Sequence, residues 1–99
     1  MTITIRPAVQ DDAEGLCALI ATMGYQVGAQ EVRARLGSLS ADHAVFVALS
    51  GPEGVGWIHV LISHSLIVGT RAELGGLAVA AEAQGTGAGS ALLLSLIHI

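Results

Sequence analysis

The chain has 99 residues, the length of a single small domain. Hydrophobic residues make up 53% of it and charged residues only 12%, so it can form a packed core and is not a disordered segment. The formal net charge is −4, with four arginines and no lysine. Because no basic patch is available to neutralise phosphates, we expect no nucleic-acid partner.

The cellular compartment is indicated by the cysteine content and by the two ends of the chain. The single cysteine, Cys17, excludes an internal disulfide and a thiolate metal cluster, and it suits a reducing compartment. The first residues lack the basic region and apolar core of a signal peptide, and residues 83–99 are too short and too glycine-rich at their start to span a membrane. We therefore expect a cytoplasmic protein without a membrane partner. We also expect no metal site, because no pair of His, Asp or Glu residues has the spacing of metal ligands.

The first third of the chain predicts a strand and two helices. Residues 2–6 alternate with period two and are rich in β-branched side chains, which is typical of a strand. A helix follows, with Asp11 and Glu14 spaced as a capping pair and Gly24 at its end. Its apolar face consists of Leu16, Leu19, Ile20 and Met23. A second helix is predicted over residues 29–39, with an apolar side formed by Val32, Leu36 and Leu39.

The rest of the chain predicts more strands and a final helix. The strands are expected at residues 43–49, 55–63 and 72–80. Residues 65–70 either extend the second of these or form a loop, and short turns between strands favour antiparallel pairing. The pair Gly75–Gly76 interrupts the last strand, which indicates a bulge or the close approach of a ligand. With an apolar helix at residues 91–99, the order is β-α-α-β-β-β-α, an α+β domain with a mostly antiparallel sheet.

A glycine-rich segment, Gln84 to Ser90, lies between the last strand and the last helix. The first N–H groups of a helix have no intrahelical partner, and the helix dipole favours negative charge there. A strand that turns through glycines into a helix is therefore suited to binding phosphate. Glycine allows a ligand to approach the backbone closely and allows the positive φ that makes N–H groups converge.

The motif alone raises four interpretations of this segment. The first, a nucleotide-hydrolase P-loop, is set aside because it requires a lysine, which the chain lacks. A dinucleotide fingerprint is incomplete, because Ser90 stands at its third glycine position and the acidic residue expected about 20 positions later has no counterpart. The pattern Gln-x-x-Gly-x-Gly is matched by Gln84, Gly87 and Gly89. A glycine-rich turn without a ligand is the fourth possibility.

The third pattern resembles the coenzyme A pyrophosphate loop of the GNAT family of N-acetyltransferases. The predicted elements are similar to the N-terminal portion of the GNAT fold along essentially the whole chain, and so are the Thr-Ile-Arg-Pro-Ala opening and the Val-Gly-Trp-Ile segment. The resemblance implies helices on both faces of the sheet. It also implies transfer of an acetyl group from acetyl-CoA to a primary amine of a small molecule or a peptide.

The resemblance also implies site residues. Backbone groups of Leu77, Ala78 and Val79 would bind the pantetheine arm as an added strand would, and the Leu77 N–H would stabilise the oxyanion. The pyrophosphate would be held by the loop, through backbone N–H groups from Gly85 to Ser90. The loop residues predicted to bind the cofactor are Gln84, Gly85, Thr86, Gly87, Ala88, Gly89 and Ser90. Glu73, five positions before Ala78, is the candidate general base, although it can also be an ordinary strand glutamate.

Other residues and the end of the chain leave alternatives open. His59 and His64 are alternative bases, or structural histidines of an apolar strand.

In the family, a further strand and helix follow the loop helix, and they include the group that protonates the leaving thiolate. Tyr25 lies in the wrong element to supply that group. We therefore expect a truncated chain, with impaired activity and a homo-oligomer formed through the exposed edge of the fourth strand. The alternatives are a non-catalytic module that binds coenzyme A or another protein, and a nucleotide-binding protein of another fold.

Overall fold

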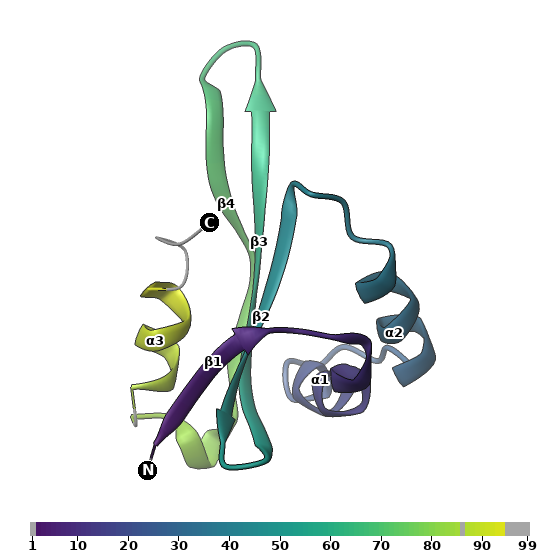
Figure 1. Ribbon diagram of the computed structural model, residues 1–99, viewed down its shortest axis with the longest axis vertical. Helices are drawn as coiled ribbons and strands as arrows, with labels where there is room; N and C mark the ends of the chain where they lie inside the picture. The colour runs from purple at the N-terminus through teal and green to yellow at the C-terminus, as the bar shows by residue number, and fades with distance from the viewer. Residues whose placement is uncertain (1, 86, 95–99) are drawn as a thin grey trace.

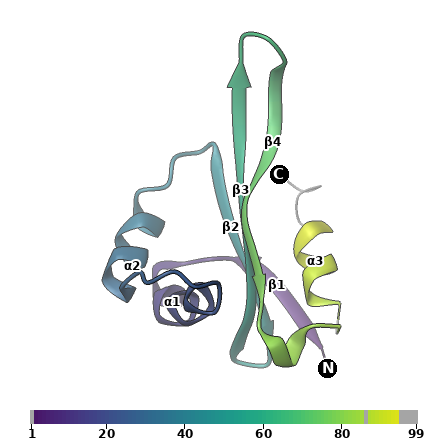
Figure 2. The same cartoon turned by 180° about the vertical axis from the view of Figure 1, so that it is seen from behind.

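The computed structural model describes residues 2–85 and 87–94. Within these residues, a four-stranded antiparallel sheet has helices on both faces, so the predicted α+β class is confirmed (Figure 1). Helices α1 and α2 lie on one face and α3 lies on the other, and the view from behind shows the same arrangement (Figure 2). The elements are β1 (Ile3–Pro7), η1 (Gln10–Asp12), α1 (Ala13–Ala21), α2 (Ala29–Gly37), β2 (His43–Ser50), β3 (Glu53–Ser65), β4 (Gly69–Val79), η2 (Ala81–Ala83) and α3 (Ala88–Leu94).

The sheet follows the chain, with strand order β1-β2-β3-β4. Each strand pairs antiparallel with the next. The connections between β2, β3 and β4 are short turns, whereas α1 and α2 lie between β1 and β2. Gly51 has a φ of +61°, which closes the tight turn between β2 and β3. Residues 65–70 form the tip of a long hairpin, because β3 extends to Ser65 and β4 begins at Gly69. This hairpin projects beyond β1 and β2 (Figure 1).

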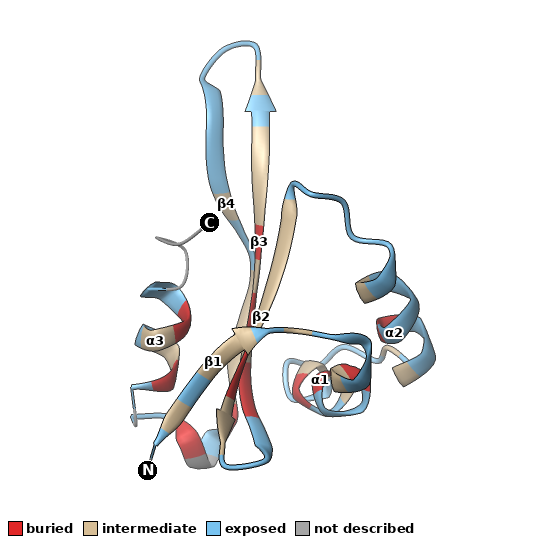
Figure 3. Cartoon of the chain, viewed as in Figure 1, coloured by how far each residue is buried: buried red, intermediate tan, exposed pale blue. Residues whose placement is uncertain are grey.

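The core has two parts, one on each face of the sheet. On the α3 face, Ile58 and Val60 of β3 pack in a cluster that also contains Leu92 of α3. On the opposite face, Leu16 of α1 and Val32 of α2 pack against β2. Figure 3 shows buried positions along the middle of the sheet and on the inner sides of the helices, whereas the tip of the β3–β4 hairpin is exposed. The sheet therefore separates two environments, and each can hold a different part of a site.

The predicted capping pair of Asp11 and Glu14 is wrong. The neighbouring Asp12 accepts a hydrogen bond from the Val9 N–H at 2.7 Å, and both of its carboxylate oxygens accept from the Arg6 guanidinium at 2.8 Å. This arrangement connects β1 to the start of the helical region. Because η1 precedes it, α1 begins only at Ala13.

The predicted helix ends also differ from the structure. Helix α1 ends at Ala21, and Met23, predicted on its buried face, is exposed because the chain turns at Gly24, which has a φ of +91°. Leu39 lies beyond the end of α2 and is exposed. The last helix begins at Ala88 rather than residue 91, and residues 95–99 lie outside the described part of the chain.

We predict that Asp12→Ala destabilises the fold by about 1–3 kcal/mol, because it removes a charge-assisted pair and the acceptor for a backbone N–H. Chemical denaturation at neutral pH measures this. The matched control is Asp11→Ala, since the Asp11 side chain is 93% exposed whereas that of Asp12 is 15% exposed. Equal losses for the two variants would contradict the assignment.

The same pair predicts a dependence of stability on pH. Hydrogen bonds from Arg6 hold the pKa of Asp12 below its ordinary value, despite the opposing effect of partial burial. The folded state therefore binds this proton more weakly than the unfolded state does. The stabilisation is complete above the ordinary pKa of an aspartate and is lost as pH falls through the lowered pKa. The difference in unfolding free energy between wild type and Asp12→Ala should shrink over that acidic range.

Candidate active site

The bulge predicted at the glycine pair is present in β4. His59 is opposite Gly76, whereas the next residue of β3, Val60, is opposite Leu74. Gly75 is therefore the extra residue in β4. A Cβ atom on Gly76 would lie 2.6 Å from Cη2 of Trp57, and one on Gly75 would lie 3.2 Å from Nδ1 of His59. Trp57 occupies the space that a side chain at Gly76 would need, and His59 leaves little space for one at Gly75, so glycine is favoured at both positions.

The three residues predicted to bind the pantetheine arm follow the bulge directly. Leu77, Ala78 and Val79 are opposite Ile58, Trp57 and Gly56 of β3. In the described part of the chain β4 is the last strand of the sheet, so its other side has no strand partner. The side chains of Leu77 and Val79 pack against the core on the α3 face. An unpaired strand edge offers backbone N–H and C=O groups to an extended ligand.

The glycine loop lies between β4 and α3, as predicted, and the short helix η2, which was not predicted, precedes it. Gly85 and Gly87 have φ values of +86° and +91°, and a Cβ atom at either position would meet no other atom within 4 Å. The loop backbone is therefore open toward its surroundings and has the conformation for which glycine is favoured. Thr86 lies outside the described residues.

The last three residues predicted for the loop belong to the first turn of α3. Ala88, Gly89 and Ser90 are helical, and the N–H of Ala91 donates to the Gly87 carbonyl at 2.9 Å. A Cβ atom on Gly89 would lie 3.7 Å from Cγ2 of Val79, so α3 lies close to the end of β4. This proximity places the start of α3 beside the strand edge.

Gln84 connects the loop to the strand. Its Nε2 donates to the Val79 carbonyl at 3.3 Å, which is one of the backbone groups predicted for the pantetheine arm. In the structure, Gln84 therefore positions the loop relative to β4. Its predicted contact with the pyrophosphate stays a prediction.

Glu73, the predicted base, lies on the face that carries α1 and α2. It is opposite Leu61, which is itself opposite His43 of β2. Its Oε1 atom accepts from Nε of Arg71 at 3.0 Å and lies 2.9 Å from Nη2 of the same side chain. The Glu73 side chain is 37% exposed, and the ion pair leaves its other oxygen for a ligand. Its role as a base stays a prediction.

The two alternative bases lie in different places. His59 lies beside the bulge, opposite Gly76. His64 is opposite Thr70 near the hairpin tip, and its Nδ1 lies 3.2 Å from the Thr70 hydroxyl. The bulge therefore has His59 beside it, whereas His64 is several residues further along the hairpin.

A further polar residue, His43, was not predicted for the site. Its Nδ1 lies 3.0 Å from Nε2 of His59, and the two share a hydrogen bond. Partial burial lowers the pKa of His59, and the nearby His43 lowers it further. His59 is therefore neutral near pH 7 and can accept a proton or a hydrogen bond. The register of β2 and β3 brings the pair together, since His59 is opposite Val45, two residues from His43.

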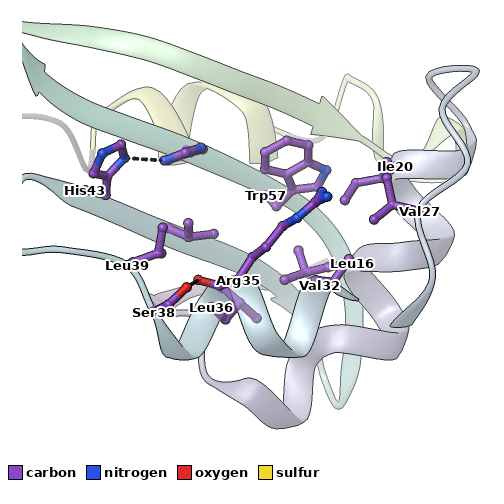
Figure 4. A pocket seen from close by; sticks show the side chains of 12 residues that line it. Leu16, Ile20, Val27, Val32, Arg35, Leu36, Ser38, Leu39, His43 and Trp57 are labelled. Atoms are coloured by element: carbon purple, nitrogen blue, oxygen red, sulfur yellow. Dashed lines mark hydrogen bonds between the residues drawn. The ribbon is translucent and has the colours of Figure 1, made fainter. Parts of the chain in front are cut away.

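A pocket adjoins this histidine pair on the α1 and α2 face, with a volume of about 360 Å³. Figure 4 shows Trp57 lying across from Leu16, Ile20 and Val27, with His43 further along the sheet.

The described residues include no group of three His, Cys, Asp or Glu side chains arranged to hold a metal ion. The helices in the described part of the chain lack the length and apolar character that a membrane span requires.

Comparison with known families gives one match. The model of the acetyltransferase (GNAT) family matches residues 12–99, which include the bulge and the glycine loop. No curated protein matches the chain.

Solved structures match nearly the whole fold of this chain. A GNAT family acetyltransferase from Staphylococcus aureus matches with a TM-score of 0.83 and 18% identity, covering 99% of this chain and 77% of that one. Glucosamine-6-phosphate N-acetyltransferase from Arabidopsis thaliana matches with a TM-score of 0.84 and 17% identity, covering 99% and 74%. A transcriptional regulator from Bacillus halodurans matches with a TM-score of 0.83 and 27% identity, covering 98% and 73%. The chain thus spans about three-quarters of each of these proteins.

We predict that Gly76→Ala destabilises the protein by about 1–3 kcal/mol, because the new methyl group would overlap the Trp57 ring and force it to move. Chemical denaturation and the emission maximum of Trp57 measure the two consequences. Gly54→Ala, in β3, is the matched control, since a Cβ atom there would meet nothing within 4 Å. An unchanged stability and emission in Gly76→Ala would show that the ring does not lie against this backbone.

Proposed function

Since the chain belongs to the GNAT family of N-acetyltransferases, we propose that it transfers the acetyl group of acetyl-CoA to a primary amine. One observation carries the proposal. The edge of β4 that follows the Gly75 bulge leads through a loop of positive-φ glycines to the start of α3. This arrangement suits a ligand with an amide-bearing arm and a diphosphate, because the arm can add to the strand edge and the diphosphate can bind loop and helix N–H groups.

The roles proposed for the site residues follow the predictions from sequence. Backbone groups of Leu77, Ala78 and Val79 bind the pantetheine arm, and the Leu77 N–H donates to the thioester oxygen as negative charge develops on it. The seven residues from Gln84 to Ser90 hold the pyrophosphate. The amine nitrogen attacks the thioester carbon, an N–C bond forms, and the C–S bond breaks to release the coenzyme A thiolate, which takes up a proton.

The amine has to lose a proton for this reaction. We propose Glu73 as the group that takes it, through the carboxylate oxygen that Arg71 does not bind. The acceptor is a small-molecule or peptide amine. Two proteins of similar fold are a glucosamine-6-phosphate N-acetyltransferase and an aminoglycoside acetyltransferase, and both names denote amine-bearing acceptors. A homo-oligomer formed through the β4 edge and a cytoplasmic location also stay predictions.

The cofactor is tested by Gly87→Ala, which we expect to weaken acetyl-CoA binding about tenfold in calorimetry, since a side chain at positive φ costs 1–3 kcal/mol and shifts the loop N–H groups. Gly24→Ala is a closely matched control. Both glycines have a φ of +91° and open space around the added methyl group, but Gly24 lies in the turn after α1, away from the loop. Equal acetyl-CoA affinity of the two variants would contradict the proposed pyrophosphate site.

The reaction is tested by thiol release from acetyl-CoA with a panel of primary amines. We expect Glu73→Gln to lower kcat about 100-fold or more while acetyl-CoA affinity stays unchanged, because a positioned base contributes at least that much. Glu53→Gln, at the exposed start of β3, is the control. An unchanged kcat in Glu73→Gln would transfer the role to another group. Acetyl-CoA binding without release of thiol for any amine would indicate a non-catalytic module instead.

A further inference from the structure

The pocket on the α1 and α2 face has the size and lining of a small-molecule site. Its volume of about 360 Å³ falls in the range of ligand pockets, which are mostly apolar with a few polar groups that orient the ligand. All of its lining residues except Arg35, Ser38, His43 and His59 are apolar. The proposed acetyl-CoA edge and loop lie at β4 and α3, so a ligand in this pocket would be a different molecule from the cofactor.

The position of His59 connects the pocket to the proposed reaction. His59 lines the pocket and is opposite Gly76, and its Nδ1 would lie 3.2 Å from a Cβ atom on Gly75. No described residue forms a hydrogen bond with this Nδ1 atom, whereas the Nε2 atom of His59 shares a hydrogen bond with Nδ1 of His43. A ligand amine that approaches His59 is therefore directed toward the bulge, where the thioester is proposed to lie.

The charge of the pocket identifies a second feature of its ligand. Arg35 is the only arginine among the lining residues, and no described carboxylate lines the pocket. The ion pair of Arg35 with Glu31 is a surface contact at 3.5 Å between side chains that are both largely exposed, so it competes weakly for the guanidinium. Ser38 donates to the backbone carbonyl of Arg35 and not to its side chain. A carboxylate on the ligand would match this guanidinium.

We propose that this pocket binds the acetyl acceptor, and that the acceptor is a primary amine with an apolar body and a carboxylate, the class that includes apolar amino acids. This inference rests on the proposed function, since it assigns the acceptor of that reaction. The apolar body lies against α1, α2 and Trp57, the carboxylate pairs with Arg35, and the amine lies at His59 beside the β4 bulge.

Trp57 provides a direct readout, because it is the one tryptophan of the chain and lines the pocket. We would titrate the full chain with phenylalanine and with 2-phenylethylamine, which differ only by the carboxylate, with and without saturating coenzyme A. Both should change the Trp57 emission, and phenylalanine should bind about three- to tenfold more tightly, as expected for an added Arg–carboxylate pair.

Two arginines of α2 give a matched test of the carboxylate contact. Arg35→Gln should remove the preference for phenylalanine and leave the affinity for 2-phenylethylamine unchanged. Arg33→Gln should retain the preference, since Arg33 pairs with Asp11 and does not line the pocket. Val45→Phe, which fills the pocket from β2, should weaken both ligands, whereas Ile3→Phe, which also enlarges a strand side chain but on the α3 face, should weaken neither.

The pocket assignment is overturned if neither compound changes the Trp57 emission, or if the preference for phenylalanine survives Arg35→Gln. Calorimetry with acetyl-CoA on the same samples separates this failure from failure of the proposed function. Binding of acetyl-CoA without binding of either amine would remove only the acceptor assignment. Loss of both would remove the acetyltransferase proposal as well.

Discussion

The backbone of β4 at Gly75 and Gly76 lies against two large side chains of β3, the Trp57 ring and the His59 imidazole. This close approach leaves no space for a Cβ atom at Gly76 and very little at Gly75. The strand accommodates it by inserting one residue, which shifts the register between Val60 and His59. The features of the candidate site described above depend on this contact, because it fixes which residues follow the bulge along the strand edge.

Residues at and beside the bulge direct their side chains to both faces of the sheet. Leu77 and Val79 turn their side chains to the core on the α3 face, so that the strand runs beside the start of α3 and its glycine loop. Trp57 and His59 point to the opposite face, where α1 and α2 enclose the apolar pocket. A cofactor on the strand edge and an acceptor in the pocket would therefore approach the same short segment from two sides, as direct transfer between them requires.

Features set by local chemistry could be predicted from the sequence. Alternation identified the first strand, and the glycines identified both the bulge and the positive-φ loop, because these depend on a few adjacent residues. The capping residue could not be identified, since Asp11 and Asp12 are chemically alike and only the position of Arg6 selects Asp12. The pairing of His43 with His59 also escaped prediction, because it depends on the register of two strands, and register is a tertiary property.

The central claim is that the outer edge of β4 binds the arm of acetyl-CoA, and amide hydrogen exchange tests it most directly. If the account is right, saturating acetyl-CoA slows exchange in the segment from Leu77 to Val79 and in the glycine loop, whereas amides of β1, the opposite edge strand, are unchanged. Protection that is absent from the β4 segment, or equal in β1 and β4, would contradict it.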